Sequence, residues 1–329
     1  MEAKTEAKPA QRTQFLRSDA MQRVLAFAAL IALFIFFSLA SPYFMTGDNV
    51  NGILLATAVN GILALGVTFV IITAGIDLSI GTVMTLSAVM TAVFITFWHL
   101  PILLGVIAGL ATGAMCGFVN GTLIARLKIP PFIATLGMLN IAKGLSLVIS
   151  GLRPIYFLDA PEFNNVAMGT IIPGVNIPNA VLIMFGAAII AALVLNKTVL
   201  GRYTFALGSN EEATRLSGVN VVRWKILVYT LTGIFSGLAG VVIASRVNSA
   251  QPALGQGYEL DAIAAAVIGG TSLSGGEGTI LGTVIGALII STLSNGLRIM
   301  SVPQEWQTVV TGAIIILAVY LDIVRRRGR

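Results

Sequence analysis

Long apolar runs follow one another along almost the whole chain, and short polar segments separate them. A helix that crosses a membrane needs about 20 predominantly apolar residues. The pattern predicts ten helices that span the membrane fully or in part, at residues 22–40, 50–73, 79–97, 102–125, 131–150, 178–196, 223–244, 258–272, 279–297 and 306–323. The chain thus divides into an N-terminal tail (1–21), a transmembrane domain (22–323) and a basic C-terminus (324–329).

The first apolar run has two interpretations. It follows basic residues and ends in Ser38-Leu39-Ala40, which resembles the cleavage site of a signal peptide. However, the run is long enough to span a membrane, and the leader before it is long and mixed in charge. We therefore expect a retained first helix rather than a cleaved signal.

The eighth run is shorter than the others and ends in Gly269 and Gly270. Glycines at the end of a short apolar run indicate a broken or re-entrant helix, which membranes tolerate only where protein or a water-filled cavity covers the backbone. The segment after it, residues 270–276, matches residues 75–81 at four of seven positions. Transporters are often built from repeats, but glycine is common throughout this chain, so chance explains the similarity equally well.

The composition places the chain in a membrane. Of all residues, 56% are hydrophobic and 10% are charged, whereas soluble proteins carry about 25% charged residues. The 35 glycines suit a membrane bundle, in which small residues let helices approach closely. The net charge of +6 does not indicate a nucleic-acid partner, because the basic residues form short clusters between apolar runs.

These basic clusters predict the orientation of the helices, since cytoplasmic loops of membrane proteins carry an excess of lysine and arginine. With a cytoplasmic N-terminus, most of the 20 lysines and arginines fall inside. We therefore expect both termini and the long connection 197–222 in the cytoplasm, and the long connection 151–177 outside. Connections of this length usually have a function or a structure of their own.

The inner connection contains the signature of a short helix. Ser209 is placed to cap its first amides, and Glu212 completes a capping box three residues later. Gly218 suits a left-handed stop. Because such a short helix is marginal in water, it must be held by the bundle or by a partner. The residues alone leave two interpretations equally open, a solvated connector and a docking helix for a cytoplasmic protein.

Four separated motifs resemble those of the ribose-type ABC sugar permeases. In chain order they are residues 73–79, residues 201–220, residues 249–252 with 257–265, and residues 269–273. The resemblance covers nearly the whole chain after the first twenty residues. It implies an all-α integral membrane protein with the type II ABC importer permease fold, ten helices per subunit, which carries a monosaccharide across the bacterial inner membrane.

The resemblance also implies partners. Two permease copies, expected to be identical, would form the pathway, a cytoplasmic double-cassette ATPase would drive it, and a periplasmic sugar-binding protein would deliver the sugar. Contacts with the ATPase would come from Ser209, Glu211, Glu212, Ala213, Thr214, Arg215 and Gly218. The chain lacks the G-x-x-x-x-G-K-[ST] phosphate loop. We therefore expect a non-catalytic transport subunit without a cofactor of its own, with ATP and Mg²⁺ on the partner.

Polar residues inside the apolar runs are expensive without a partner. Four asparagines either line the sugar pathway or form hydrogen bonds between helices, namely Asn60, Asn120, Asn140 and Asn295. We expect Ser79 or Asp77 to cap the third helix, and we expect a capping role for Asp77 rather than a contact with sugar. Lys143 is expected to form a structural pair with Glu259 or Asp261.

Three arginines fall on the predicted outer side, namely Arg153, Arg246 and Arg298. They either dock acidic residues of the binding protein or anchor the chain at the interface. His99 and Cys116 are the only histidine and cysteine, so neither a metal site nor a catalytic constellation is expected. The alternative function, an ion-coupled secondary transporter, normally requires ionisable groups in mid-membrane, and Asp77 and Lys143 both lie near the ends of their runs.

Overall fold

The structure is a computed structural model that describes residues 19–172 and 176–327. Each of the ten predicted runs forms a helix, and most ends agree within a few residues. The helices are α2 (Asp19–Ala40), α3 (Gly47–Ile72), α4 (Ile80–Ala92) with its π-helical end η1 (Val93–Phe97), α5 (Ile102–Ala125), α6 (Pro131–Ser150), α8 (Asn179–Lys197), α11 (Val221–Arg246), α12 (Tyr258–Ile268), α13 (Ile280–Ile299) and α14 (Gln304–Arg327).

The helices differ in whether they are long enough to cross a membrane. In the described part of the chain, seven segments have sufficient length and apolarity: α3, α4 with η1, α5, α6, α8, α11 and α13. The apolar part of α2, Val24–Ala40, is slightly shorter. With only 11 residues, α12 is too short to cross the membrane on its own. The all-α membrane fold is therefore confirmed, and so is the short eighth helix.

The ends of the chain lie only partly within the described residues. Of the predicted tail 1–21, residues 1–18 lie outside them. At the other end, α14 continues through residue 323 to Arg327, so most of the predicted basic C-terminus is helical. Residues 328–329 lie outside the described part.

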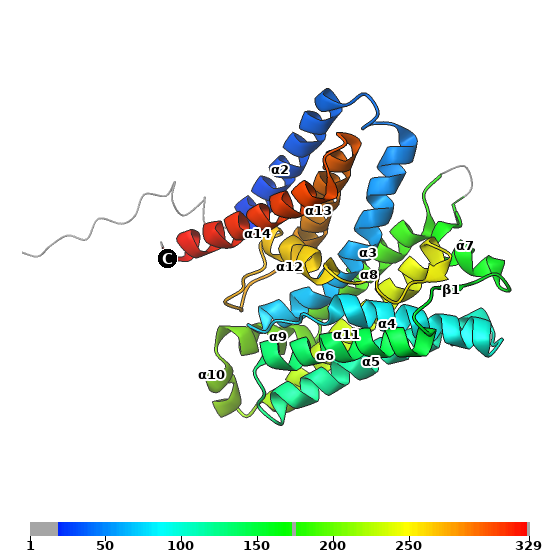
Figure 1. Cartoon of the computed structure of the whole chain (residues 1–329). Coiled ribbons are helices and arrows are strands. Elements are labelled where there is room, and N and C mark those ends of the chain that lie inside the picture. Colours follow the sequence, from blue (N-terminus) through cyan, green and yellow to red (C-terminus); the bar gives the residue numbers. More distant parts are fainter. Residues whose placement is uncertain (1–18, 173–175, 328–329) are drawn as a thin grey trace, which may run out of the picture.

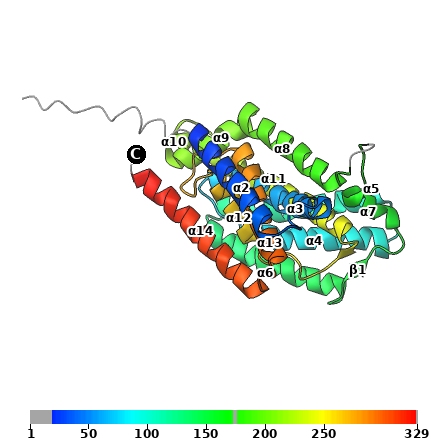
Figure 2. The ribbon, with the colours of Figure 1, turned by 90° about the horizontal axis from the view of Figure 1, so that it is seen from above.

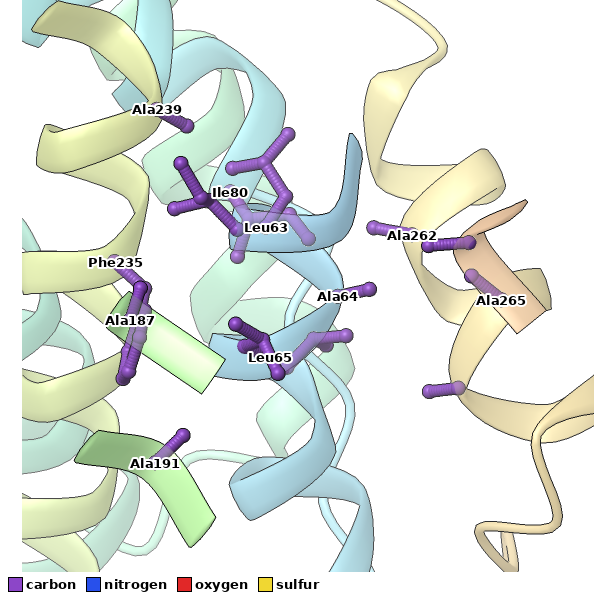
Figure 3. Close-up of a cluster of buried hydrophobic side chains, with 14 of the residues drawn as sticks. Leu63, Ala64, Leu65, Ile80, Ala187, Ala191, Phe235, Ala239, Ala262 and Ala265 are labelled. Atoms are coloured by element: carbon purple, nitrogen blue, oxygen red, sulfur yellow. The ribbon is translucent and has the colours of Figure 1, made fainter. Parts of the chain in front are cut away.

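Helix α3 occupies the centre of the bundle, and 94% of the residues in its most apolar stretch are buried. Figure 3 shows Leu63 and Leu65 of α3 between Phe235 of α11 on one side and Ala262 of α12 on the other. Helices α5 and α11 pack against each other most extensively, and a methyl group at Gly113 would overlap the carbonyl oxygen of Gly233. The abundant glycines thus allow backbone-to-backbone packing, as membrane bundles require.

The long connection 151–177 has structure of its own. It contains β1 (Ile155–Tyr156), the 3₁₀ turn η2 (Pro161–Phe163) and α7 (Asn164–Met168), and β1 pairs antiparallel with β2 (Ser249–Ala250). The hydroxyl of Ser245 donates to the carbonyl of Phe163 at 2.6 Å and accepts from the amide of Ala167 at 2.9 Å. These bonds tie the connection to the end of α11. Its residues 173–175 lie outside the described part.

The two long connections lie at opposite ends of the molecule. In Figures 1 and 2, α10 (Glu211–Leu216) and the end of α14 lie at the left, whereas α7 and β1 lie at the right. This separation agrees with the one predicted from the basic residues. The assignment of the α10 end to the cytoplasm stays a prediction.

Candidate functional site

A cavity of about 500 Å³ lies where several helices end. Its walls come from the first half of α3, the end of α11, the start of α12, the end of α13 and the start of α14. Helix α12 begins here because Gly257 adopts a positive φ of 93°, which turns the chain from the loop after β2 into the helix. The short eighth helix, α12, therefore places its first turn directly in the wall of the cavity.

The cavity wall carries polar atoms without a protein partner. Among the described residues, the side-chain oxygens of Asn60, Ser291 and Asn295 are buried and accept no hydrogen bond. The amide nitrogen of Asn295 donates to Asn49 at 2.9 Å, which fixes the orientation of the group. A buried polar group without a partner costs about 1–3 kcal/mol. A solute rich in hydroxyl groups supplies the donors that these oxygens lack.

Three charged residues also line the cavity. Arg246 donates from Nη1 to the carbonyl of Leu55 at 3.2 Å, so its side chain bridges α11 and α3. Arg298 lies in the wall beside the end of α13. The carboxylate of Asp261 faces the cavity and has no hydrogen bond or ion pair within the described part of the chain. It is therefore available to a ligand.

The sequence-predicted polar residues are only partly brought together. Asn60 and Asn295 line the cavity. Asn120 instead donates to Ser79 at 3.0 Å, a bond between α5 and the turn before α4. Asn140 is exposed on α6 and bonds to the carbonyl of Leu136 in its own helix. The structure thus brings two of the four asparagines to the cavity.

Of the three arginines predicted on the outer side, two line the cavity and one does not. Arg246 and Arg298 line the cavity, whereas Arg153 is exposed in the connection just before β1. Their docking to a binding protein stays a prediction.

The predicted pair between Lys143 and an acid of α12 is wrong. Helix α6, which carries Lys143, packs against α4 and α5, whereas α12 packs mainly against α13 and α3. Among the described residues the ion pairs are Glu212 with Arg215 and Lys225 with Glu211. Residues at the same depth in the membrane do not meet when their helices lie on different sides of the bundle.

The prediction for Asp77 needs a smaller correction. Its carboxylate accepts from the amide of Ser79 at 2.9 Å and from the hydroxyl of Ser79 at 2.6 Å. Helix α4 begins at Ile80, and its N-cap residue is Ser79. The side chain of Ser79 accepts no hydrogen bond from the first amides of the helix. Asp77 therefore closes the turn before the helix instead of capping its first amides. It is also 2% exposed, more deeply buried than an open inner-side turn implies.

The inner connection folds into two helices at the opposite end of the bundle from β1. They are α9 (Val199–Ser209), which the apolar pattern did not predict, and α10. Because Ser209 is the last residue of α9, the predicted cap is wrong by one position. Asn210 is the N-cap of α10, and its Oδ1 accepts from the amide of Ala213 at 2.9 Å. The predicted stop is confirmed, since Gly218 has a φ of 83°.

Glu212 does not complete the predicted capping box. Its carboxylate pairs with Arg215 at 2.6 Å, and this hydrogen bond and the charge of Glu212 raise the pKa of Arg215. Glu211 pairs with Lys225 of α11 at 2.6 Å and so ties α10 to a membrane helix. The pair between Glu211 and Lys225 thus anchors α10 to α11. The negative charges of Glu211 and Glu212 also interact favourably with the positive N-terminal end of the helix dipole.

The corrected cap leads to a prediction about α10. Asn210→Ala is expected to destabilise this helix by about 1 kcal/mol, since it removes the acceptor for the Ala213 amide. Hydrogen exchange at residues 211–216 measures the change. Ser209→Ala is the matched control and is expected to leave exchange unchanged. Equal acceleration in both variants would contradict the assignment of the cap.

The surface of α10 differs from the predicted contact set in two residues. Thr214 is 7% exposed and donates to the carbonyl of Ala206 at 3.0 Å, so it holds α10 on α9 and does not face a partner. Leu216 was missed, although its side chain is 78% exposed. The sequence signal that could have identified Leu216 is an apolar residue within a short polar helix. The other predicted contacts, Ser209, Glu211, Glu212, Ala213, Arg215 and Gly218, are exposed.

Comparisons with known proteins agree over most of the chain. The family described as "Branched-chain amino acid transport system / permease component" matches residues 49–319. The ribose import permease protein of Bacillus subtilis (strain 168) is 42% identical over 97% of this chain and 98% of its own length. That of Escherichia coli (strain K12) is 43% identical over 89% and 91%. The fructose import permease protein of Rhizobium meliloti is 38% identical over 95% and 88%. No solved structure matches significantly.

Proposed function

Since this chain belongs to the permease-component family and, within it, to the ribose-type sugar permeases, we propose that it forms the membrane pathway of an ATP-driven monosaccharide importer. The relatives are named for import or transport of ribose, fructose, D-allose and xylose. The chain is therefore a multi-pass transport subunit rather than an enzyme. We place it in the bacterial inner membrane with both termini in the cytoplasm.

The observation that carries this proposal is the polar cavity inside an apolar bundle. Unpaired oxygens of Asn60, Ser291 and Asn295, together with the carboxylate of Asp261, offer acceptors to the hydroxyl groups of a sugar. A pathway must bind its solute weakly enough to release it. Hydrogen bonds from several side chains meet that requirement, because the solute is not enclosed by a ring of charged groups.

The two ends of the bundle suit different partners. At one end, α10 presents the exposed residues Glu212, Arg215 and Leu216, and we propose that a double-cassette ATPase docks there. At the other end, the cavity and the exposed Arg153 would face a periplasmic sugar-binding protein, whose carboxylates arginine suits. A second copy of this chain would complete the pathway.

Transport assays test the proposal. The chain, co-expressed with a double-cassette ATPase and a sugar-binding protein from its own genome, is expected to take up radiolabelled D-ribose into proteoliposomes when ATP is enclosed. D-Xylose, D-allose and D-fructose are tested in parallel. The energy source identifies the mechanism, because uptake must stop without ATP and persist with a protonophore. Uptake that is independent of ATP and is abolished by the protonophore would instead identify an ion-coupled secondary transporter.

A further inference from the structure

The two segments with similar sequences, 75–81 and 270–276, each form a turn, and the two turns share one local hydrogen bond. Each follows a helix that packs in the bundle core, α3 in one case and α12 in the other. In the first, the amide of Ser79 donates to the Asp77 carboxylate at 2.9 Å. In the second, the amide of Ser274 donates to the Ser272 hydroxyl at 3.1 Å. Asp77 and Ser272 occupy the same position in the two segments, as do Ser79 and Ser274.

The second turn meets residues 72–74, which lie just before the first turn, at the end of α9. The amide of Gly276 donates to the carbonyl of Ile72 at 2.9 Å. Gly275 lies against Ala74 and against the carbonyl of Gly208. A methyl group at Gly208 would in turn overlap the carbonyl oxygen of Ile72. We call these five residues, Ile72, Ala74, Gly208, Gly275 and Gly276, the glycine junction.

The glycine junction is built from backbone rather than from flexible side chains. Gly275 and Gly276 have φ values of 83° and 76°, and Ala74 has a φ of 59°, so all three occupy the left-handed region. Close-packed interiors have low compressibility and transmit displacement. Gly208 has no side chain that could absorb a movement before the movement reaches the end of α3 and the second turn.

The helices that leave the glycine junction end in the cavity. Helix α3 reaches the junction at Ile72 and lines the cavity at Asn60. Helix α12 precedes the second turn and lines the cavity at Asp261, and α13 follows that turn and lines the cavity at Asn295. The three helices pack on one another along their length, and Figure 3 shows α12 beside α3. At the other side of the junction, α10 begins three residues after Gly208.

We propose that the glycine junction is the coupling contact of the transporter, which passes a displacement of α10 to α3, α12 and α13 and so changes access to the cavity. The inference rests on the proposed function, because the ATPase is what would displace α10. Within the glycine junction, Gly208 is the residue whose lack of a side chain sets the distance between α9, the end of α3 and the second turn. Gly208 acts through its neighbours and touches no sugar, so it is a positioning residue.

The test uses the complete complex with its ATPase and a thiol in the cavity wall. Cys116, the only cysteine, is replaced by alanine, and Ser294→Cys supplies the reporter. The rate of its alkylation by a charged maleimide is measured without nucleotide and with ATP plus vanadate. The parent is expected to show a nucleotide-dependent difference in rate. Gly208→Ala is expected to lose that difference while the ATPase stays bound.

Gly186→Ala is the matched control, because nothing lies within 4 Å of a methyl group at this position, and it must keep the difference. A Gly208→Ala complex that responds to ATP as the parent does overturns the coupling role. Should this variant not assemble, Ser272→Ala removes the hydrogen bond of the second turn without adding volume. Loss of the difference then supports the proposal, and retention overturns it. A parent that never responds to ATP would indicate instead that the proposed function is wrong.

Discussion

Asp261→Ala is expected to lower sugar uptake by about tenfold or more while ATP hydrolysis by the partner continues. The carboxylate lines the cavity and has no partner within the described residues. A hydrogen bond to a charged group contributes about 1.5–3 kcal/mol, which corresponds to roughly 10- to 100-fold in affinity. Uptake of radiolabelled D-ribose and release of phosphate are measured on the same proteoliposomes, so that loss of binding is separated from loss of coupling.

Two further variants test whether the lost uptake is caused by the loss of the Asp261 carboxylate. Asp261→Asn keeps one acceptor oxygen and is expected to retain part of the uptake that alanine removes. Asp48→Asn changes an exposed acid in the first turn of α3 that does not line the cavity, and uptake should stay at the parental level. If Asp261→Ala transported sugar as well as Asp48→Asn does, the cavity would not be the pathway.

The sequence predicted the membrane helices well because the requirements that lipid imposes on a helix are local. A spanning segment must satisfy its own backbone and present apolar side chains over a fixed length, and both properties can be read from one stretch of chain. The short α12 was recognisable for the same reason, since its apolar run stops at Gly269 and Gly270. Helix α9 was missed because it is short and mixed in polarity.

The errors in the site arose where a role depends on a neighbour distant in sequence. Lys143 was assigned to the acids of α12 by depth alone, but depth does not say which side of the bundle a helix occupies. Ser209 was assigned as a cap one position too early, because the end of α9 decides which residue begins α10. The cavity itself was invisible, since its walls come from five helices spread across the whole chain.

The similarity between residues 75–81 and 270–276 shows how a weak sequence signal gains meaning from structure. On the sequence, a repeat and chance explain the four matches in seven positions equally well, because the chain has 35 glycines. In the structure, Asp77 and Ser272 each accept a hydrogen bond from the backbone amide two residues later, and Gly275 of the second turn lies against Ala74, the residue before the first turn. The shared hydrogen bond involves no glycine, so it does not follow from the glycine content of the chain. The contacts of Gly275 connect the pattern to the end of α9 and so to α10.

Leu216→Ser is expected to weaken the binding of the ATPase to the membrane subunit by roughly 10- to 100-fold, because burial of a leucine side chain contributes about 1.5–3 kcal/mol. This side chain is 78% exposed at the end of α10, a helix whose other exposed side chains are charged except for the small Ala213. A few residues that become fully buried in a partner carry most of the binding energy of an interface. Affinity is measured as the ATPase concentration that half-saturates the detergent-solubilised permease.

The matched control for this variant is Leu127→Ser. Leu127 is 64% exposed in the turn between α5 and α6, outside α10, and its replacement should leave ATPase binding unchanged. Equal loss in the two variants would mean that general surface polarity, rather than a docking contact, controls assembly. Surface ion pairs such as Glu212 with Arg215 contribute at most about 1 kcal/mol. The exposed leucine, rather than the acidic turn that made the helix recognisable, should therefore supply most of the affinity.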